Sequence, residues 1–183
     1  MRRVLGIVLG GLLLAGPLPA QEAGRKVAGQ CRTCHGLDGI AAIPIAPNIG
    51  GEPAAYLQAQ LLAFKTGARE HEMMSVVAAG LSEQQIADVA DWYAAQNVTA
   101  TLTAPEEDAP ELCTACHGVD GIAVAEDAPN LAGEPNIYIV TQLKAFRIGK
   151  REHAVMSEIA KGLSDAEMRA VADWYAAIDL TAE

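Results

Sequence analysis

The feature that most constrains the fold of this chain is a five-residue motif that occurs twice, 82 residues apart. Cys31–His35 (CRTCH) returns as Cys113–His117 (CTACH), and the same offset then holds without a gap to the end of the second copy. Residues 31–95 are identical to residues 113–177 at 36 of 65 positions. A fixed period of this kind indicates that the chain contains two copies of one small domain.

The first 20 residues have the composition of an export signal. Residues 1–3 are positively charged, residues 4–15 are apolar, and residues 16–20 are small or helix-breaking, as in a secretory signal peptide. The alternative is an uncleaved membrane anchor, but about a dozen apolar residues are short for a bilayer, which needs about 20. We therefore expect residues 1–20 to be removed and the protein to be periplasmic.

Helix signals fall at equal positions in the two copies. Capping boxes at Ser82 and Ser164 begin the last helices, near 82–96 and 164–178. Proline at the start and glycine at the end delimit middle helices, near 53–66 and 135–148. No segment shows sustained period-two alternation, so we expect no sheet.

The first helix differs between the copies. It runs from about Gly24 to Cys34, but Pro105 and Pro110 limit its counterpart to a stub that begins near Asp108 or Ala109. The predicted fold class is therefore all-α, with two tandem domains that each wrap a few helices around a cofactor. The expected N-terminal domain is 21–97, the linker 98–108 and the C-terminal domain 109–183.

The repeated motif Cys-x-x-Cys-His is the attachment signature of c-type haem. Two thiols on one helical turn form thioethers with the vinyl groups of the porphyrin, and the adjacent histidine lies under the iron. The alternatives are a disulfide, a thioredoxin-like redox pair or a zinc ribbon. A thioredoxin motif needs a β-α-β pattern, zinc ribbons space their pairs more closely, and neither explains the histidine.

We therefore predict two haem c groups, each covalently attached and each containing iron. The thiols that attach them are Cys31 and Cys34 in the first copy and Cys113 and Cys116 in the second. Only 4% of the residues are aromatic, and domains of about 80 residues bury little of their surface. Haem would then supply much of each core.

The iron in each domain needs a second axial ligand in addition to His35 or His117. Met74 and Met156 are related by the 82-residue offset and are expected in a Gly-rich loop between the middle and last helices. The position equivalent to Met73 is Val155, so Met73 does not recur in the second copy and is not a candidate ligand. Met168 is expected in the core. His71 and His153, three residues before each methionine, are the alternative ligands.

Other repeated residues have expected roles around the haem. The carbonyls of Pro47 and Pro129 are candidates to hold the second ring nitrogen of each haem histidine. Arg69 and Arg151 pair either with haem propionates or with solvent. A repeated Trp-Tyr pair is expected to pack the last helix against the first: Trp92, Tyr93, Trp174 and Tyr175.

The order of motifs resembles the cytochrome c4 family of dihaem class I cytochromes c over nearly all of residues 24–178. In each copy Cys-x-x-Cys-His-Gly is followed by Pro-Asn, Tyr, Gln-Leu, Phe, Arg, Met, Leu-Ser and Trp-Tyr. The resemblance implies two cytochrome c domains packed face to face, propionates near the interface, and one His/Met haem in each. The family carries a small residue where the first helix crosses the last, matched by Gly24, whereas the second copy has Glu106.

Such coordination predicts an electron carrier rather than an enzyme, because a six-coordinate iron has no open position for substrate. We expect transfer from a membrane quinol-oxidising complex to a terminal oxidase or reductase, and peripheral association with the membrane is compatible with this function. One alternative is the dihaem subunit of a periplasmic dehydrogenase, such as flavocytochrome c sulfide dehydrogenase. Another is a dihaem peroxidase, which needs one displaceable iron ligand.

The charge of the chain bears on its partners. The chain has 13 Lys and Arg residues and 23 Asp and Glu residues, which gives a net charge of −10. This charge argues against nucleic-acid binding, because phosphate groups are bound by clusters of Lys and Arg. Residues 21–104 carry eight acids and five bases, whereas residues 105–183 carry 15 acids and six bases. The second domain either docks on a basic partner or has an ordinary solvated surface.

Overall fold

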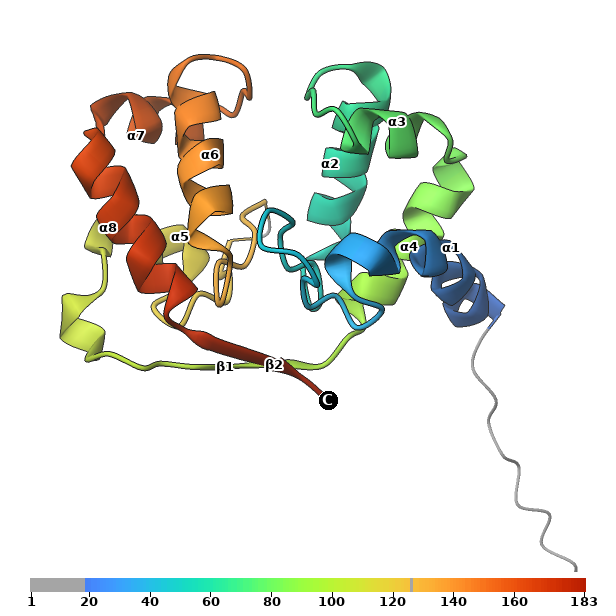
Figure 1. Ribbon diagram of the computed structural model, residues 1–183, viewed down its shortest axis with the longest axis horizontal. Coiled ribbons are helices and arrows are strands. Elements are labelled where there is room, and N and C mark those ends of the chain that lie inside the picture. Colours follow the sequence, from blue (N-terminus) through green and yellow to red (C-terminus); the bar gives the residue numbers. More distant parts are fainter. Residues whose placement is uncertain (1–18, 126) are drawn as a thin grey trace, which may run out of the picture.

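The computed structural model describes residues 19–125 and 127–183. The predicted signal peptide, residues 1–20, lies outside the described residues except for its last two. Within the described part of the chain, no helix combines the length and apolar character that a membrane span requires. The two copies of the repeat form two helical domains side by side (Figure 1), so the predicted mainly helical, two-domain class is confirmed.

The N-terminal domain is built around the crossing of its first and last helices. Its elements are α1 (Pro19–His35), α2 (Ala54–Thr66), α3 (Met74–Ala79) and α4 (Glu83–Ala94). At the crossing Gly24 lies against α4, where an added Cβ would come within 2.2 Å of the carbonyl oxygen of Asp88. Glycine is therefore required at position 24 for α1 and α4 to pack this closely.

The C-terminal domain lacks this crossing. Its elements are η1 (Glu106–Asp108), α5 (Glu111–His117), α6 (Asn136–Arg147), α7 (Met156–Gly162) and α8 (Asp165–Ala176). The stub begins at Glu111 rather than near Asp108 or Ala109, because Pro110 has an extended backbone. Among the described helices α5 has no extensive packing against α8, in contrast to α1 and α4.

The last helix of each domain begins at its predicted capping box. The Ser82 hydroxyl accepts from the Gln85 amide at 3.2 Å while the Gln85 side chain accepts from the Ser82 amide at 2.9 Å. Ser164 and Glu167 make the same reciprocal pair at the start of α8. The helix starts predicted from these residues are therefore confirmed.

A short sheet joins the linker to the end of the chain, and the expectation of no sheet was wrong. β1 (Val98–Thr101) pairs antiparallel with β2 (Asp179–Ala182), with Val98 opposite Ala182. Four residues contain only two cycles of alternation, too few to stand out in the sequence. Part of the predicted linker, residues 98–108, is thus a strand that pairs with a segment about 80 residues away.

Each domain has its own core, and the two domains meet through their middle helices. The first core includes Val27 and Ala28 from α1, with Ile86 and Val89 from α4. The second core includes Met168, which is fully buried as expected. Polar side chains on α2 and α6 reach across between the domains, and these two helices face each other at the centre of Figure 1.

Candidate haem sites and the interface between them

The first Cys-x-x-Cys-His motif forms the last turns of α1. Cys31 and Cys34 are half-buried and carry free thiols. His35 is 8% exposed, and its Nδ1 donates to the carbonyl oxygen of Pro47 at 2.9 Å. Burial lowers the pKa of His35, which favours a neutral imidazole whose Nε2 has a lone pair for a metal ion.

The second motif forms α5 and repeats this geometry. Cys113 and Cys116 are half-buried free thiols, and His117 is 6% exposed with Nδ1 2.8 Å from the carbonyl oxygen of Pro129. Burial lowers the pKa of His117, and the Pro129 carbonyl and Asp127 oppose this effect. The predicted proline acceptors for both histidines are thus confirmed, and each fixes the tautomer of its ring.

The two motifs lie in separate domains, which bears on the zinc alternative. Among the described residues, no three His, Cys, Asp or Glu side chains come together as ligands of a metal ion. A zinc ribbon would need four such ligands in one place. Each motif therefore offers two thiols and a single imidazole, which is the donor set of one haem c attachment site.

Met74 and Met156 lie at the start of short helices rather than in a loop. Met74 is the first residue of α3 and Met156 the first of α7, and both side chains are half-buried. The sequence did not indicate these helices, which have six and seven residues. Met73, the neighbour that fails the repeat test, is 65% exposed.

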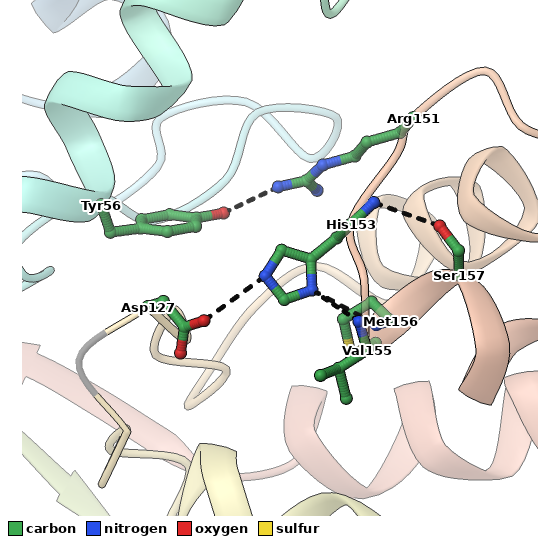
Figure 2. A network of polar contacts seen from close by, with 7 residues as sticks. All are labelled: Tyr56, Asp127, Arg151, His153, Val155, Met156 and Ser157. Atoms are coloured by element: carbon green, nitrogen blue, oxygen red, sulfur yellow. Dashed lines mark hydrogen bonds and ion pairs between the residues drawn. The ribbon is translucent and has the colours of Figure 1, made fainter.

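The two histidines that compete with these methionines have a local structural role. Nδ1 of His71 accepts from the backbone amides of Met73 and Met74, each at 3.3 Å, and His153 caps α7 in the same way. Figure 2 shows that Nε2 of His153 also faces Asp127, at 3.5 Å. Because Nδ1 of each ring accepts from backbone N–H groups, the proton of the neutral imidazole lies on Nε2, which then has no lone pair for iron. These contacts therefore favour methionine as the ligand.

Arg69 and Arg151 are buried between the domains, which excludes the solvated alternative. Their exposed fractions are 8% and 9%. Arg69 donates to Gln60 of its own domain at 2.7 Å, and across the interface to Gln142 at 2.7 Å and to the Tyr138 hydroxyl at 3.3 Å.

Arg151 makes the same contacts in the opposite direction. It donates to Gln142 of its own domain and across the interface to Gln60, both at 2.9 Å, and to the Tyr56 hydroxyl at 3.0 Å (Figure 2). Each guanidinium also lies over a phenylalanine ring of its own domain, at 4.4 Å from the Phe64 centroid and 4.5 Å from that of Phe146. The interface is therefore built from two equivalent sets of contacts.

These two buried cations provide a test of whether haem fits the site. Among the described residues, neither Arg69 nor Arg151 has a carboxylate within 4.0 Å. A buried charge is costly unless a charge of opposite sign lies nearby. Haem carries two propionates, so the residues present fit a haem whose acidic edge is directed to the interface.

The interface also holds two buried carboxyl groups that the sequence analysis gave no role. Glu52 and Glu134 are 3% and 2% exposed. Burial raises the pKa of Glu52 to about 8, and it raises the pKa of Glu134 well above its usual value, with repulsion from Glu52 adding to the effect. Their recurrence at the 82-residue offset was the available signal.

The Trp-Tyr pairs hold the last helix against the haem-binding turn. In the first domain the Tyr93 hydroxyl donates to the Gly36 carbonyl at 2.9 Å and Trp92 Nε1 donates to the Leu37 carbonyl at 3.0 Å. In the second, the Tyr175 hydroxyl donates to the Gly118 carbonyl at 3.2 Å, whereas Trp174 Nε1 is buried and has no hydrogen-bond partner within the described part of the chain. The Trp-Tyr pair thus makes fewer hydrogen bonds to the haem-binding turn in the second domain than in the first.

Two cysteines outside any disulfide, a buried imidazole held by a proline carbonyl, and a helical shell define each half of the molecule as a c-type cytochrome domain. A model of the cytochrome c family matches residues 21–94 and 109–177. A cytochrome c4 of Pseudomonas aeruginosa is 30% identical over 85% of this chain and 89% of its own length. The chain belongs to the cytochrome c4 family, is an electron-transfer protein and carries two covalently attached haem c groups.

Two further relatives extend the comparison. The crystal structure of reduced recombinant cytochrome c4 from Pseudomonas stutzeri matches with a TM-score of 0.77 and 26% identity, covering 87% of this chain and 98% of that one. A protein named thiosulfate dehydrogenase electron acceptor, from Thiomonas intermedia, is 34% identical over 99% of this chain and 93% of its own length. Relatives of both names thus span the two domains.

Proposed function

We propose that the protein is a periplasmic electron carrier with one His/Met haem in each domain. In this proposal Cys31, Cys34, Cys113 and Cys116 hold the porphyrins, and the iron ligands are His35 with Met74 and His117 with Met156. The observation that carries it is the pair of buried histidines whose Nδ1 is bound by a proline carbonyl at 2.9 and 2.8 Å. That contact leaves Nε2 as the nitrogen for iron.

The role of the chain in this function is to position the haems and set their surroundings. When bound, haem supplies a one-electron Fe(III)/Fe(II) couple, and two protein ligands leave no site for substrate. Arg69 and Arg151 supply positive charge for the propionates. The contacts across α2 and α6 fix the distance between the two domains. We propose 21–97 and 109–183 as the domains, joined by 98–108, and we infer no catalytic activity.

The ligand assignment is tested by the optical spectrum of the ferric protein. A methionine sulfur bound to ferric haem gives a weak charge-transfer band, and we expect both haems to contribute to it. Met74→Ala and Met156→Ala should each remove about half of the band, and Met73→Ala is the matched control because Met73 is exposed and has no methionine counterpart. Retention of the full band in both variants would overturn the assignment.

The donor and acceptor are proposed from chemistry and from the relatives. We propose that the carrier takes electrons from a membrane quinol-oxidising complex and passes them to a terminal oxidase or reductase. The second candidate is that it accepts electrons from a thiosulfate dehydrogenase, which the name of the Thiomonas relative favours. The two are separated by stopped-flow reduction with each purified donor, since only the physiological donor should reduce the haems rapidly.

An acidic surface on the second domain supports docking to a basic partner. It consists of the three acidic side chains of η1, Glu106, Glu107 and Asp108, which are exposed. If this surface docks, the bimolecular rate falls as salt rises, because ions screen exposed charges over about 10 Å at 0.1 M. A rate that does not change with ionic strength would remove this surface from the proposal.

A further inference from the structure

The haem-binding loop of the C-terminal domain is held by a carboxyl group from the N-terminal domain. Oε2 of Glu52, in the N-terminal domain, accepts from the backbone amide of Asn130 in the C-terminal domain at 2.9 Å. The carbonyl of the same peptide group, Pro129–Asn130, accepts from Nδ1 of His117 at 2.8 Å. One peptide group therefore lies between a carboxyl of one domain and the haem histidine of the other.

The equivalent connection in the opposite direction, from Glu134 of the C-terminal domain toward His35, is less complete. The Glu134 carboxyl faces the backbone amide of Asn48, and the Pro47–Asn48 peptide carbonyl accepts from His35 at 2.9 Å. Oε2 of Glu134, however, is buried and has no hydrogen-bond partner among the described residues. The two connections thus use equivalent positions of the repeat, but the carboxyl of Glu52 is hydrogen-bonded more completely than that of Glu134.

Side-chain contacts of the two asparagines keep both loops in register with the facing domain. The Asn130 amide donates to the carbonyl of Gly51 at 3.0 Å, and the Asn48 amide donates to the carbonyl of Gly133 at 2.9 Å. Their Oδ1 atoms accept from the amides of Ala123 and Ala41, at 2.9 and 2.8 Å. The peptide groups beside them are therefore fixed in place, as a hydrogen-bond relay requires.

We propose that Glu52 is a positioning residue that tunes the haem iron of the opposite domain through the Asn130 amide, the Pro129 carbonyl and His117. Glu134 faces the equivalent Asn48 amide on the His35 side and has a weaker effect there. The inference rests on the proposed function, in which these histidines bind iron. Its new element is that each domain sets a property of the other domain's haem.

The physical basis is the conjugation of the peptide bond. A stronger acceptor at the N–H polarises the peptide, because electron density is shared between nitrogen and carbonyl oxygen. The carbonyl oxygen then accepts more strongly from His117 Nδ1, and the imidazole becomes a better donor to iron. Better donation stabilises Fe(III) relative to Fe(II), so the reduction potential falls when the carboxyl acts as an anion.

The titratable and charged groups near Glu52 come from both domains. Glu134 is the other acid, Tyr56 and Tyr138 are phenols, and Arg69 and Arg151 are cations beside those phenols. Burial raises the pKa of Tyr56 to about 12, so its hydroxyl stays protonated near neutral pH. Burial also raises the pKa of Glu52 to about 8, so this carboxyl ionises within an accessible pH range.

The test compares Glu52→Gln with Glu134→Gln in the haem-loaded protein. The reduction potentials of the two haems are followed separately through their methyl resonances in proton NMR. Between pH 6 and 9 the wild-type potential of the His117 haem should fall. At a fixed applied potential, the ferric-to-ferrous ratio of this haem should change up to about tenfold. A tenfold change corresponds to a shift of about 59 mV in a one-electron reduction potential. Glu52→Gln, which cannot ionise, should abolish this fall for the His117 haem only.

Glu134→Gln is the matched control and should affect only the His35 haem, with a smaller change because its hydrogen bonding is less complete. Glu52→Ala removes the acceptor altogether and should raise the potential of the His117 haem at every pH. A change of equal size at both haems in either variant would show a loosened interface and would overturn the relay. So would a change confined to the haem of the substituted domain.

A measurement on the wild-type protein covers the case in which a variant fails to fold. The amide proton resonance of Asn130 in the ferrous protein should shift as Glu52 ionises, with the same midpoint as the potential of the His117 haem. A resonance that stays constant through that range would overturn the proposal. The ferric spectrum of the same sample tests the ligands independently, so failure of the relay and failure of the His/Met assignment are distinguishable.

Discussion

The two domains share a haem-binding turn but differ in what covers it. In the first domain the 17 residues of α1 cross α4 and place Val27 and Ala28 in the core. In the second domain α5 has only seven residues. Hydrophobic residues of the linker segment and of the C-terminal strand pack against its core: Ala100, Leu102 and Leu180.

This difference shows which part of the repeat carries the chemistry and which part is replaceable. The motif, the proline acceptor and the capped last helix are present in both domains. The long first helix is present in one. A segment that joins the domains has taken over part of its covering role, so we expect the second domain to depend on the linker and the chain end for stability.

The largest effect is expected where the first domain alone relies on a helix crossing. Gly24→Leu places atoms where the Asp88 carbonyl lies, 2.2 Å from an added Cβ, and should lower the free energy of unfolding by about 4 kcal/mol. Thermal unfolding followed in the haem absorption band measures this change. Glu106→Ala, at the exposed equivalent position of η1, is the control, and a comparable loss there would contradict the proposed difference.

The next effect concerns the interface that both domains share. A carboxyl whose pKa is raised on folding retains a proton that the unfolded chain has lost, so stability falls as pH rises between the two values. For Glu52 those values are 4.5 and about 8. We expect the free energy of unfolding to fall as the pH rises across this range, measured by denaturant titration. Glu52→Gln should reduce the slope, and an unchanged slope would argue against the buried acid as its source.

A smaller effect should distinguish the second domain. Removal of residues 179–183 deletes β2 and its pairing with β1, and it should cost the second domain about 2 kcal/mol from lost hydrogen bonds and apolar burial. Calorimetry should show a lower transition for this domain with little change in the first. Asp179→Asn, an exposed change within β2, is the control. An equal shift of both transitions would mean that the strand pair supports the whole molecule.

The smallest effect should be the same in both domains. Ser82→Ala and Ser164→Ala each remove the hydroxyl of a complete capping box, and each should cost about 1 kcal/mol. Urea titration of the two variants measures the change. Ser82→Thr and Ser164→Thr, which keep a capping hydroxyl, should recover most of it. A clearly larger loss in one domain would show that the last helices are not equivalent.

Most of the haem-binding arrangement was predictable because it depends on local residue order. Each haem histidine lies within four residues of its two thiols, the two members of each capping box are three residues apart, and the repeat marks these motifs twice. The distance of twelve residues from His35 to Pro47 was also predictable, because the histidine needs an acceptor and the loop is short. The methionine ligands remain predictions that the ferric spectrum will test.

The parts that were missed depend on contacts between distant segments. β1 pairs with residues about 80 positions later, so its short alternation had no visible partner. The burial of Arg69, Arg151, Glu52 and Glu134 depends on how the second domain lies against the first. The short helices α3 and α7 begin at amides capped by histidine, a residue outside the usual capping set of Ser, Thr, Asp and Asn.

The paired contacts at the interface give the molecule the symmetry of a homodimer within one chain. Arg69 bonds to Gln142 as Arg151 bonds to Gln60, which is the self-complementary pattern of a two-fold interface. In a true homodimer a mutation changes both copies of a contact. Here it changes one, so the halves are free to diverge while the contact surface persists. The uneven distribution of acidic residues between the halves is such a divergence. The two haem domains are nearly equivalent in their contacts, but they differ in net charge.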